Sequence, residues 1–179
     1  MLHVSQLADA LALPWQAPLP PTVLAADTVM LLAAWVGAIA PLDLDRLLTP
    51  TPSRGRSLRN LTVNVCHPFG LLPDAWASGR FPWFPEQDGE REAPLTTIDD
   101  IVGYAVEIDR EWRAFVAATG DELDASDPVV TTPRGATSYS VVLDTQRWHA
   151  AYHLRQLEHV LGCHVTPPLD ELALPADVF

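Results

Sequence analysis

The fold is decided by residues 148–161, Trp148-His149-Ala150-Ala151-Tyr152-His153-Leu154-Arg155-Gln156-Leu157-Glu158-His159-Val160-Leu161. This stretch contains neither Gly nor Pro, and its Leu and Val positions recur at helical spacing over about four turns. His149 and His153 stand four residues apart, so a helix places both imidazoles on one face, one turn apart. Two imidazoles in that arrangement can reach a single metal ion. The stretch therefore predicts a helix that carries two metal ligands.

A third metal ligand must come from another part of the chain, and His67 is the candidate. It follows a helix that we expect to start near Ser57 and to reach at least Cys66. Asn60 and Arg56 lie two and three turns before His67 on the same face. That face carries polar groups at core depth, which a purely structural helix would avoid. We therefore predict a metal site formed by His67, His149 and His153.

Pro68 follows His67 directly and disturbs this helix. A proline inside a helix removes one hydrogen bond and clashes with the carbonyl four residues earlier, here that of Asn64. We expect the helix either to kink at His67 or to end there and restart toward Trp76.

An earlier helix is expected from about Thr22 to Ala40, because Pro21 suits a first turn and Pro41 stops the helix. Apolar residues nearly surround it, which is typical of a buried core helix. The nearly continuous apolar run 29–42 is interrupted by Pro41 and falls short of the ~20 residues that a bilayer span needs. No membrane-spanning segment is predicted.

Two more helix boundaries follow from capping residues. Thr97 with Asp100 resembles a capping box and predicts a third helix that ends at Gly120. Asp144 is the expected N-cap of the last helix, and Gly162 is its C-cap.

Two long connections remain between these helices. Residues 77–95 are aromatic and Pro-rich, and we expect their aromatic side chains to cover the core rather than to bind substrate. Residues 121–140 have few apolar side chains. Brief strand pairing between Val129-Val130 and 141–143 is left open.

Composition indicates one globular domain, because 48% of the 179 residues are hydrophobic and 19% are charged. We divide it into an N-terminal strap (1–20), a helical bundle (20–162) and a C-terminal tail (163–179). The 23 acidic residues outnumber the 11 basic ones, all Arg, for a net charge of -12. This balance argues against nucleic acid or an anionic membrane as a partner.

Two cysteines, Cys66 and Cys163, do not make a disulfide framework, and we expect both to be buried. No signal peptide is evident, so a cytoplasmic protein with reduced thiols is expected. The chain has no Gly-rich phosphate loop, no Gly-x-Ser-x-Gly elbow and no Cys-x-x-Cys. The last helix lacks the Glu that a zinc protease needs after its first His, which disfavours peptide hydrolysis. The other histidines are expected at the surface: His3, His159 and His164.

Together these motifs resemble the DinB/YfiT-like superfamily of metal-binding four-helix bundles. The resemblance spans roughly residues 20–162, and it is carried by Arg56-Ser57-Leu58-Arg59, by His67, and by His149-x-x-x-His153-x-Arg155-Gln156-Leu157-Glu158. It implies an all-α four-helix bundle in up-down-down-up order. The long crossover after the second helix would be supplied by residues 77–95.

The resemblance also implies a function. In that family three such histidines bind a divalent metal ion, often zinc or nickel, which activates mycothiol, bacillithiol or glutathione in bacterial transferases and isomerases. We therefore expect a metal-dependent thiol transferase or isomerase whose partner is a small electrophilic substrate. Arg56 or Arg59 would hold a carboxylate of the thiol or the substrate. Three side chains would orient groups at the site: Asn60, Asn64 and Gln156.

Other functions stay open beside this expectation. One is a non-catalytic metal-binding or protein-interaction bundle that has kept the fold. Another is an iron-dependent oxygenase with a three-His face, which is disfavoured because the usual facial carboxylate is missing. A homodimer is also left open.

Overall fold

The computed structural model of the chain describes residues 19–52, 55–84 and 88–168. These residues are mostly helical, with one small two-stranded sheet, which agrees with the predicted helical fold class. Nearly all of the predicted strap (1–20) and most of the predicted tail (163–179) lie outside the described residues, and so does His3.

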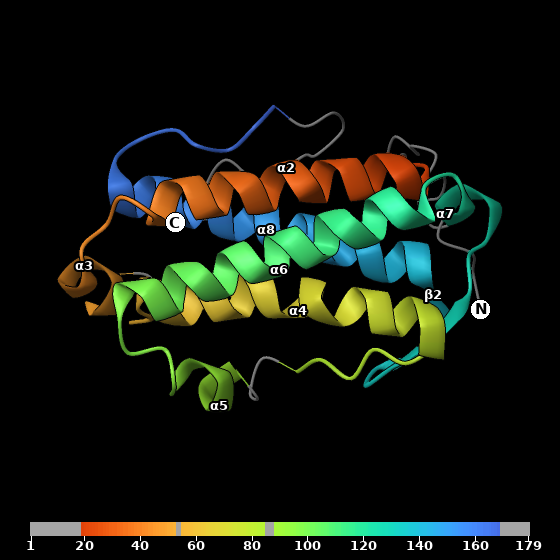
Figure 1. Ribbon diagram of the computed structural model, residues 1–179, viewed down its shortest axis with the longest axis horizontal. Coiled ribbons are helices and arrows are strands. Elements are labelled where there is room, and N and C mark those ends of the chain that lie inside the picture. The colour runs from red at the N-terminus through yellow and green to blue at the C-terminus, as the bar shows by residue number, and fades with distance from the viewer. Residues whose placement is uncertain (1–18, 53–54, 85–87, 169–179) are drawn as a thin grey trace, which may run out of the picture.

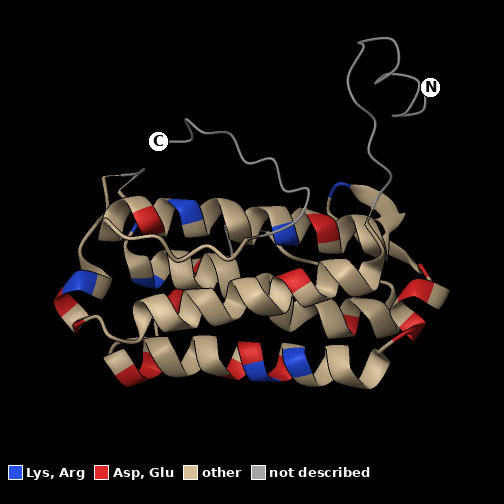
Figure 2. Cartoon of the chain, turned by 90° about the horizontal axis from the view of Figure 1, so that it is seen from above, with Lys and Arg blue, Asp and Glu red and all other residues tan. Residues whose placement is uncertain are grey.

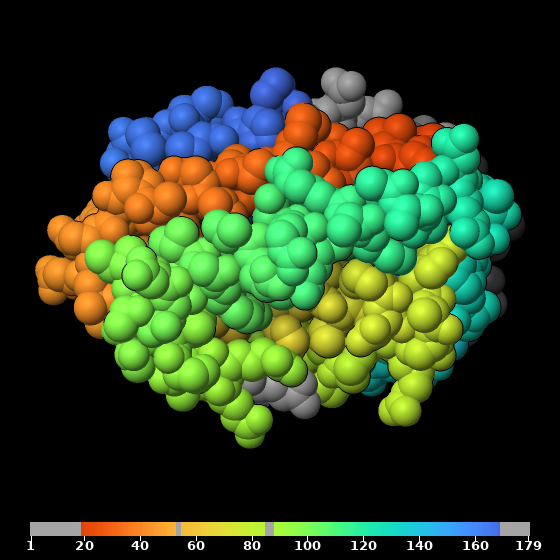
Figure 3. Space-filling model, viewed as in Figure 1, coloured from red at the N-terminus to blue at the C-terminus, as the bar shows by residue number. Residues whose placement is uncertain are grey.

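Four long helices lie side by side and form the body of the molecule (Figure 1). Helix α2 packs against α6 and α8, and helix α4 packs against the same two neighbours. In Figure 1, α4 and α6 run in one direction, while α2 and α8 run in the other. The space-filling view shows α2 and α6 as adjacent bands across the front face, with α4 visible below α6 mainly on the right (Figure 3). The bounds are α2 Pro21–Ile39, α4 Leu58–Ser78, α6 Ile98–Thr119 and α8 Tyr139–Leu161.

Shorter elements occupy the connections. Helix α3 (Leu44–Leu48) follows α2, α5 (Asp88–Glu92) lies in the crossover between α4 and α6, and α7 (Glu122–Ala125) follows α6. Strands β1 (Val129–Thr132) and β2 (Gly135–Ser138) form an antiparallel hairpin before α8. Val129 therefore pairs with Ser138, whereas residues 141–143, the strand partner left open above, belong to α8.

Helix α2 is the core helix that its composition predicts. Pro21 occupies its first turn, and the helix ends at Ile39, before Pro41. Among the described helices, α2 alone is long and apolar enough to span a membrane. Half of its most apolar 18-residue segment is buried within the molecule, as in the core helix of a folded domain. Packing against α6 and α8 explains its hydrophobicity.

Helix α4 begins where the sequence predicts but does not end at His67. The Ser57 side chain accepts a hydrogen bond from the backbone N–H of Asn60, which caps the first turn. The helix continues through Pro68 and Pro73 to Ser78, so the alternative in which it ends at His67 is wrong. Twelve of its 21 residues are buried, and we attribute its continuity to this burial, which offsets the lost hydrogen bonds.

Helix boundaries near α6 and α8 test the predicted caps. The Thr97–Asp100 capping box is present in full, and Gly120 follows the last residue of α6. Gly162 caps α8 in the left-handed conformation, with φ of 68°. Asp144 is not the N-cap, because α8 begins five residues earlier and Ser138 accepts the capping hydrogen bond from Val141. The extra turn buries apolar side chains at helical spacing: Tyr139, Val142 and Leu143.

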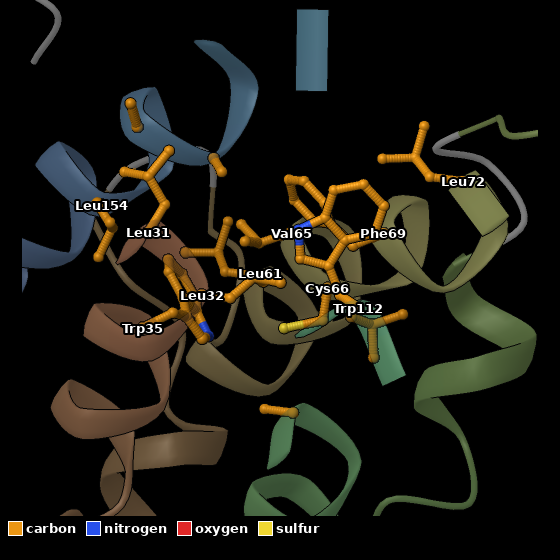
Figure 4. Close-up of a cluster of buried hydrophobic side chains, with 14 of the residues drawn as sticks. Leu31, Leu32, Trp35, Leu61, Val65, Cys66, Phe69, Leu72, Trp112 and Leu154 are labelled. Atoms are coloured by element: carbon orange, nitrogen blue, oxygen red, sulfur yellow. The ribbon is translucent and has the colours of Figure 1, made fainter. Parts of the chain in front are cut away.

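Buried side chains from all four long helices fill the centre (Figure 4). Two fully buried tryptophans satisfy their indole N–H groups: Trp35 donates to Thr62 (3.1 Å), and Trp112 donates to Thr28 (2.9 Å). Cys66 lies in this core as predicted, where burial raises the pKa of its thiol. Cys163 is exposed, which corrects the expectation that it is buried, because it lies just beyond the C-cap of α8.

Asp27 and Arg147 form an ion pair in the interior of the helical bundle. Arg147 on α8 donates from Nε to Oδ2 of Asp27 on α2 at 2.6 Å, and both side chains are at most 9% exposed. Other acidic and basic positions occur on several helices and near both ends of the molecule (Figure 2). Because the Asp27–Arg147 pair is buried, it connects α2 to α8 within the core.

Candidate metal centre

His149 and His153 lie together on α8, as their spacing predicts. Their ring centroids are 4.6 Å apart, and the ring planes are nearly perpendicular at 88°. Trp83, from the crossover after α4, packs against His149 with ring centroids 5.2 Å apart. Tyr152 packs against His153 at 5.3 Å. Aromatic side chains from two segments therefore flank the histidine pair.

A chain of hydrogen bonds fixes the tautomer of His149. Asn64 on α4 donates from Nδ2 to Oδ2 of Asp88 at 2.7 Å, which leaves its Oδ1 as an acceptor. This Oδ1 lies 3.2 Å from Nε2 of His149. The imidazole must donate in that contact, so the proton of the neutral ring is on Nε2 and the lone pair is on Nδ1.

The lone-pair nitrogen of His149 faces no hydrogen-bond donor from residues 19–52, 55–84 or 88–168. Nδ1 is buried and lacks a hydrogen-bond partner within the part of the chain that the structure describes. A buried acceptor that remains unpaired is destabilising, and such atoms are uncommon in folded proteins. An imidazole lone pair held in this way is the group that a metal ion or a ligand N–H would use.

Gln156 orients the second imidazole. Nδ1 of His153 lies 2.5 Å from Oε1 of Gln156, one turn further along α8, and both side chains are buried. A carboxamide oxygen only accepts, so Nδ1 of His153 donates and the ring lone pair is on Nε2. Gln156, predicted to orient a group at the site, thus contacts His153.

Both His149 and His67 are neutral rings at pH 7. Burial, together with the nearby charges of His153 and Arg56, lowers the pKa of His149 to about 3. Burial, together with the charge of Arg91, lowers the pKa of His67 to about 4. A metal ion binds the neutral form of imidazole, so neither ring needs to lose a proton before binding at pH 7.

The structure does not assemble the three predicted ligands into one site. His67 is buried on α4, one turn beyond Asn64. No group of three or more His, Cys, Asp or Glu side chains within the described ranges is arranged to hold a metal ion. The His149–His153 pair fits a divalent ion by its donor atoms, whereas a third protein ligand is not in place.

Two residues predicted to hold or orient ligands have other contacts. Arg59 forms an ion pair with Glu92 of α5 at 2.8 Å, and Asn60 donates from Nδ2 to the other oxygen of Glu92 at 2.6 Å. Arg56 is partly buried, and its charge acts on both His149 and Asp88. Of the two predicted arginines, Arg56 is therefore the one whose charge acts on His149.

Asp88 and Trp83 are site residues that the sequence reasoning missed. Asp88 is 2% exposed, and it accepts hydrogen bonds from Asn64 and, at 3.4 Å, from Nε1 of Trp83. Burial raises the pKa of Asp88, while these donors and two nearby arginines oppose the rise. The sequence shows only that Asp88 is an acidic residue within an aromatic-rich connection. No neighbouring residue indicates that its side chain contacts α4.

No protein-family model, curated protein or solved structure matches this chain. Membership of the DinB/YfiT-like superfamily therefore stays a prediction from the sequence motifs.

Proposed function

We propose that the chain is an up-down-down-up four-helix bundle of the DinB/YfiT type that binds a divalent metal ion, zinc or nickel, through His149 and His153. The directions of the four long helices support the bundle class. The observation that carries the metal proposal is the buried, unpartnered Nδ1 of His149, whose ring lies 4.6 Å from that of His153. His67 is the candidate for the third ligand.

The surroundings of the pair support binding rather than chance proximity. Asn64 and Gln156 each contact one ring nitrogen, so each imidazole keeps its lone pair on the other nitrogen. Partners of this kind usually hold metal-binding imidazoles in place. Asp88 in turn orients Asn64, which extends the support to a third segment of the chain.

The proposed activity is that of a cytoplasmic thiol S-transferase or isomerase that uses a low-molecular-weight thiol and a small electrophile. A divalent metal ion bound at the site would supply a deprotonated thiol at neutral pH. Arg56 would hold a carboxylate of the thiol or the substrate, since its charge acts on His149. Arg59 is less suited, because Glu92 already neutralises it.

Metal content of the purified protein tests the binding proposal. Protein prepared without a metal-affinity step should retain one zinc or nickel ion per chain, measured by inductively coupled plasma mass spectrometry. His149→Ala and His153→Ala should each lose that ion. His159→Ala is the matched control, because this histidine is exposed on the same helix. Equal metal content in all four proteins would refute the proposed pair, and His67→Ala decides whether His67 is a ligand.

Thiol consumption separates an enzyme from a non-catalytic binder. The metal-loaded protein is incubated with monochlorobimane and, in turn, mycothiol, bacillithiol or glutathione, while fluorescence is followed. Metal-dependent turnover with one thiol, lost in His149→Ala, is expected. Retained metal without turnover of any thiol would reject the transferase proposal and favour a non-catalytic metal-binding bundle.

A further inference from the structure

A cavity of about 420 Å³ is lined in part by Trp83, the side chain that packs against His149. Its walls come from three segments: the start of the crossover after α4, the β1–β2 turn and the first turns of α8. The crossover contributes three aromatic side chains: Phe81, Trp83 and Phe84. This volume lies within the range of roughly 300–1,000 Å³ that is usual for small-molecule sites.

Backbone hydrogen bonds hold the hairpin against the crossover. Thr131 donates to the carbonyl of Gly79 at 2.8 Å, and Phe81 donates back to the carbonyl of Thr131 at 2.9 Å. Gly79 has φ of 67°, and a Cβ there would lie 3.2 Å from the carbonyl oxygen of Val129. In Figure 1 the hairpin lies against the chain that leaves α4. The cavity walls are therefore joined to one another by the fold.

Gln146 places a buried polar side chain in a wall that also contains aromatic side chains, valines and threonines. The residue is 3% exposed, and its Oε1 has no hydrogen-bond partner among the residues that the structure describes. A buried carboxamide oxygen without a donor is unfavourable. A ligand N–H or O–H would satisfy it.

Arg134 provides the positive charge of the cavity. It lies in the β1–β2 turn, it is exposed, and no other lining residue is charged. It forms no ion pair with a described residue. In a chain with a net charge of -12, a single arginine at a cavity edge favours an anionic ligand group.

We propose that this cavity binds a small aromatic carboxylate that carries an N–H or O–H donor. The aromatic ring packs between Phe81, Trp83 and Phe84, the donor reaches Oε1 of Gln146, and the carboxylate faces Arg134. Trp83 also contacts His149, so the bound ligand would lie next to the histidine pair. The site does not require a metal ion, and it stands independently of the proposed thiol chemistry.

Three related probes test each contact by isothermal titration calorimetry. Indole-3-acetate offers the ring, the N–H and the carboxylate, 1-methylindole-3-acetate lacks the N–H, and indole-3-acetamide lacks the charge. Indole-3-acetate should bind with one site per chain, and loss of the N–H should weaken binding about tenfold. Loss of the carboxylate should weaken it about threefold, since Arg134 is exposed. This comparison uses the unaltered protein and does not depend on any variant folding.

Variants then locate the contacts. Gln146→Leu should bind indole-3-acetate and its N-methyl analogue equally, and Arg134→Gln should bind the acetate and the acetamide equally. Arg110→Gln, on the exposed face of α6, is the control that loses a charge outside the cavity. Absence of binding by all three probes overturns the proposal. So does binding whose probe preferences are the same in Gln146→Leu, Arg134→Gln and the unaltered protein, since the ligand would then lie elsewhere.

Discussion

Asn64 on α4 and His149 on α8 meet across the helix interface, with 3.2 Å between Oδ1 of Asn64 and Nε2 of His149. Because Asn64 also donates to Asp88, its orientation is fixed and His149 must be the donor. One amide thus joins α5, α4 and α8 and directs the lone pair of His149 to Nδ1.

Replacing Asn64 should release the tautomer of His149. In Asn64→Leu, Nε2 of His149 and the carboxylate of Asp88 both lose a partner, so the free energy of unfolding should fall by about 1–3 kcal/mol. Imidazole ¹⁵N chemical shifts should show His149 as a mixture of tautomers instead of the Nε2–H form. Urea unfolding and ¹⁵N NMR measure the two effects.

Asn60→Leu is the matched control for that substitution. It removes a side-chain amide on the same helix that also bonds to α5, but through Glu92. A similar loss of stability with unchanged His149 shifts is expected. If Asn60→Leu altered the His149 shifts as much as Asn64→Leu does, a specific role for Asn64 would be excluded.

Glu158 should stabilise the fold at neutral pH and lose this effect in acid. Burial opposes its ionisation, but hydrogen bonds from the backbone N–H groups of Thr166 and Val165 and from the side chains of Thr166 and Arg155 outweigh it and lower its pKa from 4.5 to about 2. A group whose pKa is lowered by folding contributes stability above its unfolded pKa, and that contribution disappears as the pH falls through its folded pKa. Glu158→Gln should therefore reduce stability by about 1–2 kcal/mol at pH 7.

The pH profile of urea unfolding tests this assignment. The difference between the unaltered protein and Glu158→Gln should be constant above pH 5 and should shrink from about pH 4.5 toward pH 3. A difference that stays the same over this range would mean that the carboxylate charge is not the source of the stabilisation.

Ser138 should matter more than Asp144 for α8. Ser138 accepts the capping hydrogen bond from Val141, so Ser138→Ala should reduce the free energy of unfolding by about 1 kcal/mol. Asp144 lies within the helix rather than at its start, and its side chain is exposed. Its contact with Arg147 is long, at 3.5 Å. Asp144→Ala should stay within about 0.5 kcal/mol of the unaltered protein. A larger loss in Asp144→Ala than in Ser138→Ala would contradict the observed helix start.

The buried Asp27–Arg147 pair should respond non-additively to substitution. Asp27→Leu leaves the guanidinium of Arg147 buried without the Asp27 carboxylate and should cost about 3–5 kcal/mol. The double variant Asp27→Leu/Arg147→Met should be more stable than Asp27→Leu alone, because neither charge remains buried. Additive losses in thermal or urea unfolding would show that the two side chains do not act as a pair.

Local side-chain chemistry made much of the helical fold predictable. The Ser57 cap, the Thr97–Asp100 capping box and Gly162 act within a few residues of their own position, so their meaning can be recognised in the sequence. The start of α8 was not predictable in that way, since β-branched residues at 141 and 142 favour strands locally and tertiary burial overrides them. Continuity of α4 through Pro68 also depends on packing.

The candidate site was predictable where it lies within one helix and, across helices, at Asn64, which the sequence predicts as an orienting residue and which contacts His149. The i, i+4 spacing of His149 and His153 gave their proximity directly. The contacts of Asp88 and Trp83 depend on how residues 79–97 cross over α4, which no short-range pattern specifies. The position of His67 relative to the pair likewise depends on the register between two helices.

The most direct test is ¹⁵N NMR of histidine-labelled protein before and after one equivalent of Zn²⁺. We expect the lone-pair nitrogens, Nδ1 of His149 and Nε2 of His153, to shift, while Nε2 of His149 keeps its proton and the exposed His159 and His164 are unaffected. Unchanged His149 and His153 resonances, or shifts confined to His159 and His164, would contradict a metal site at this pair.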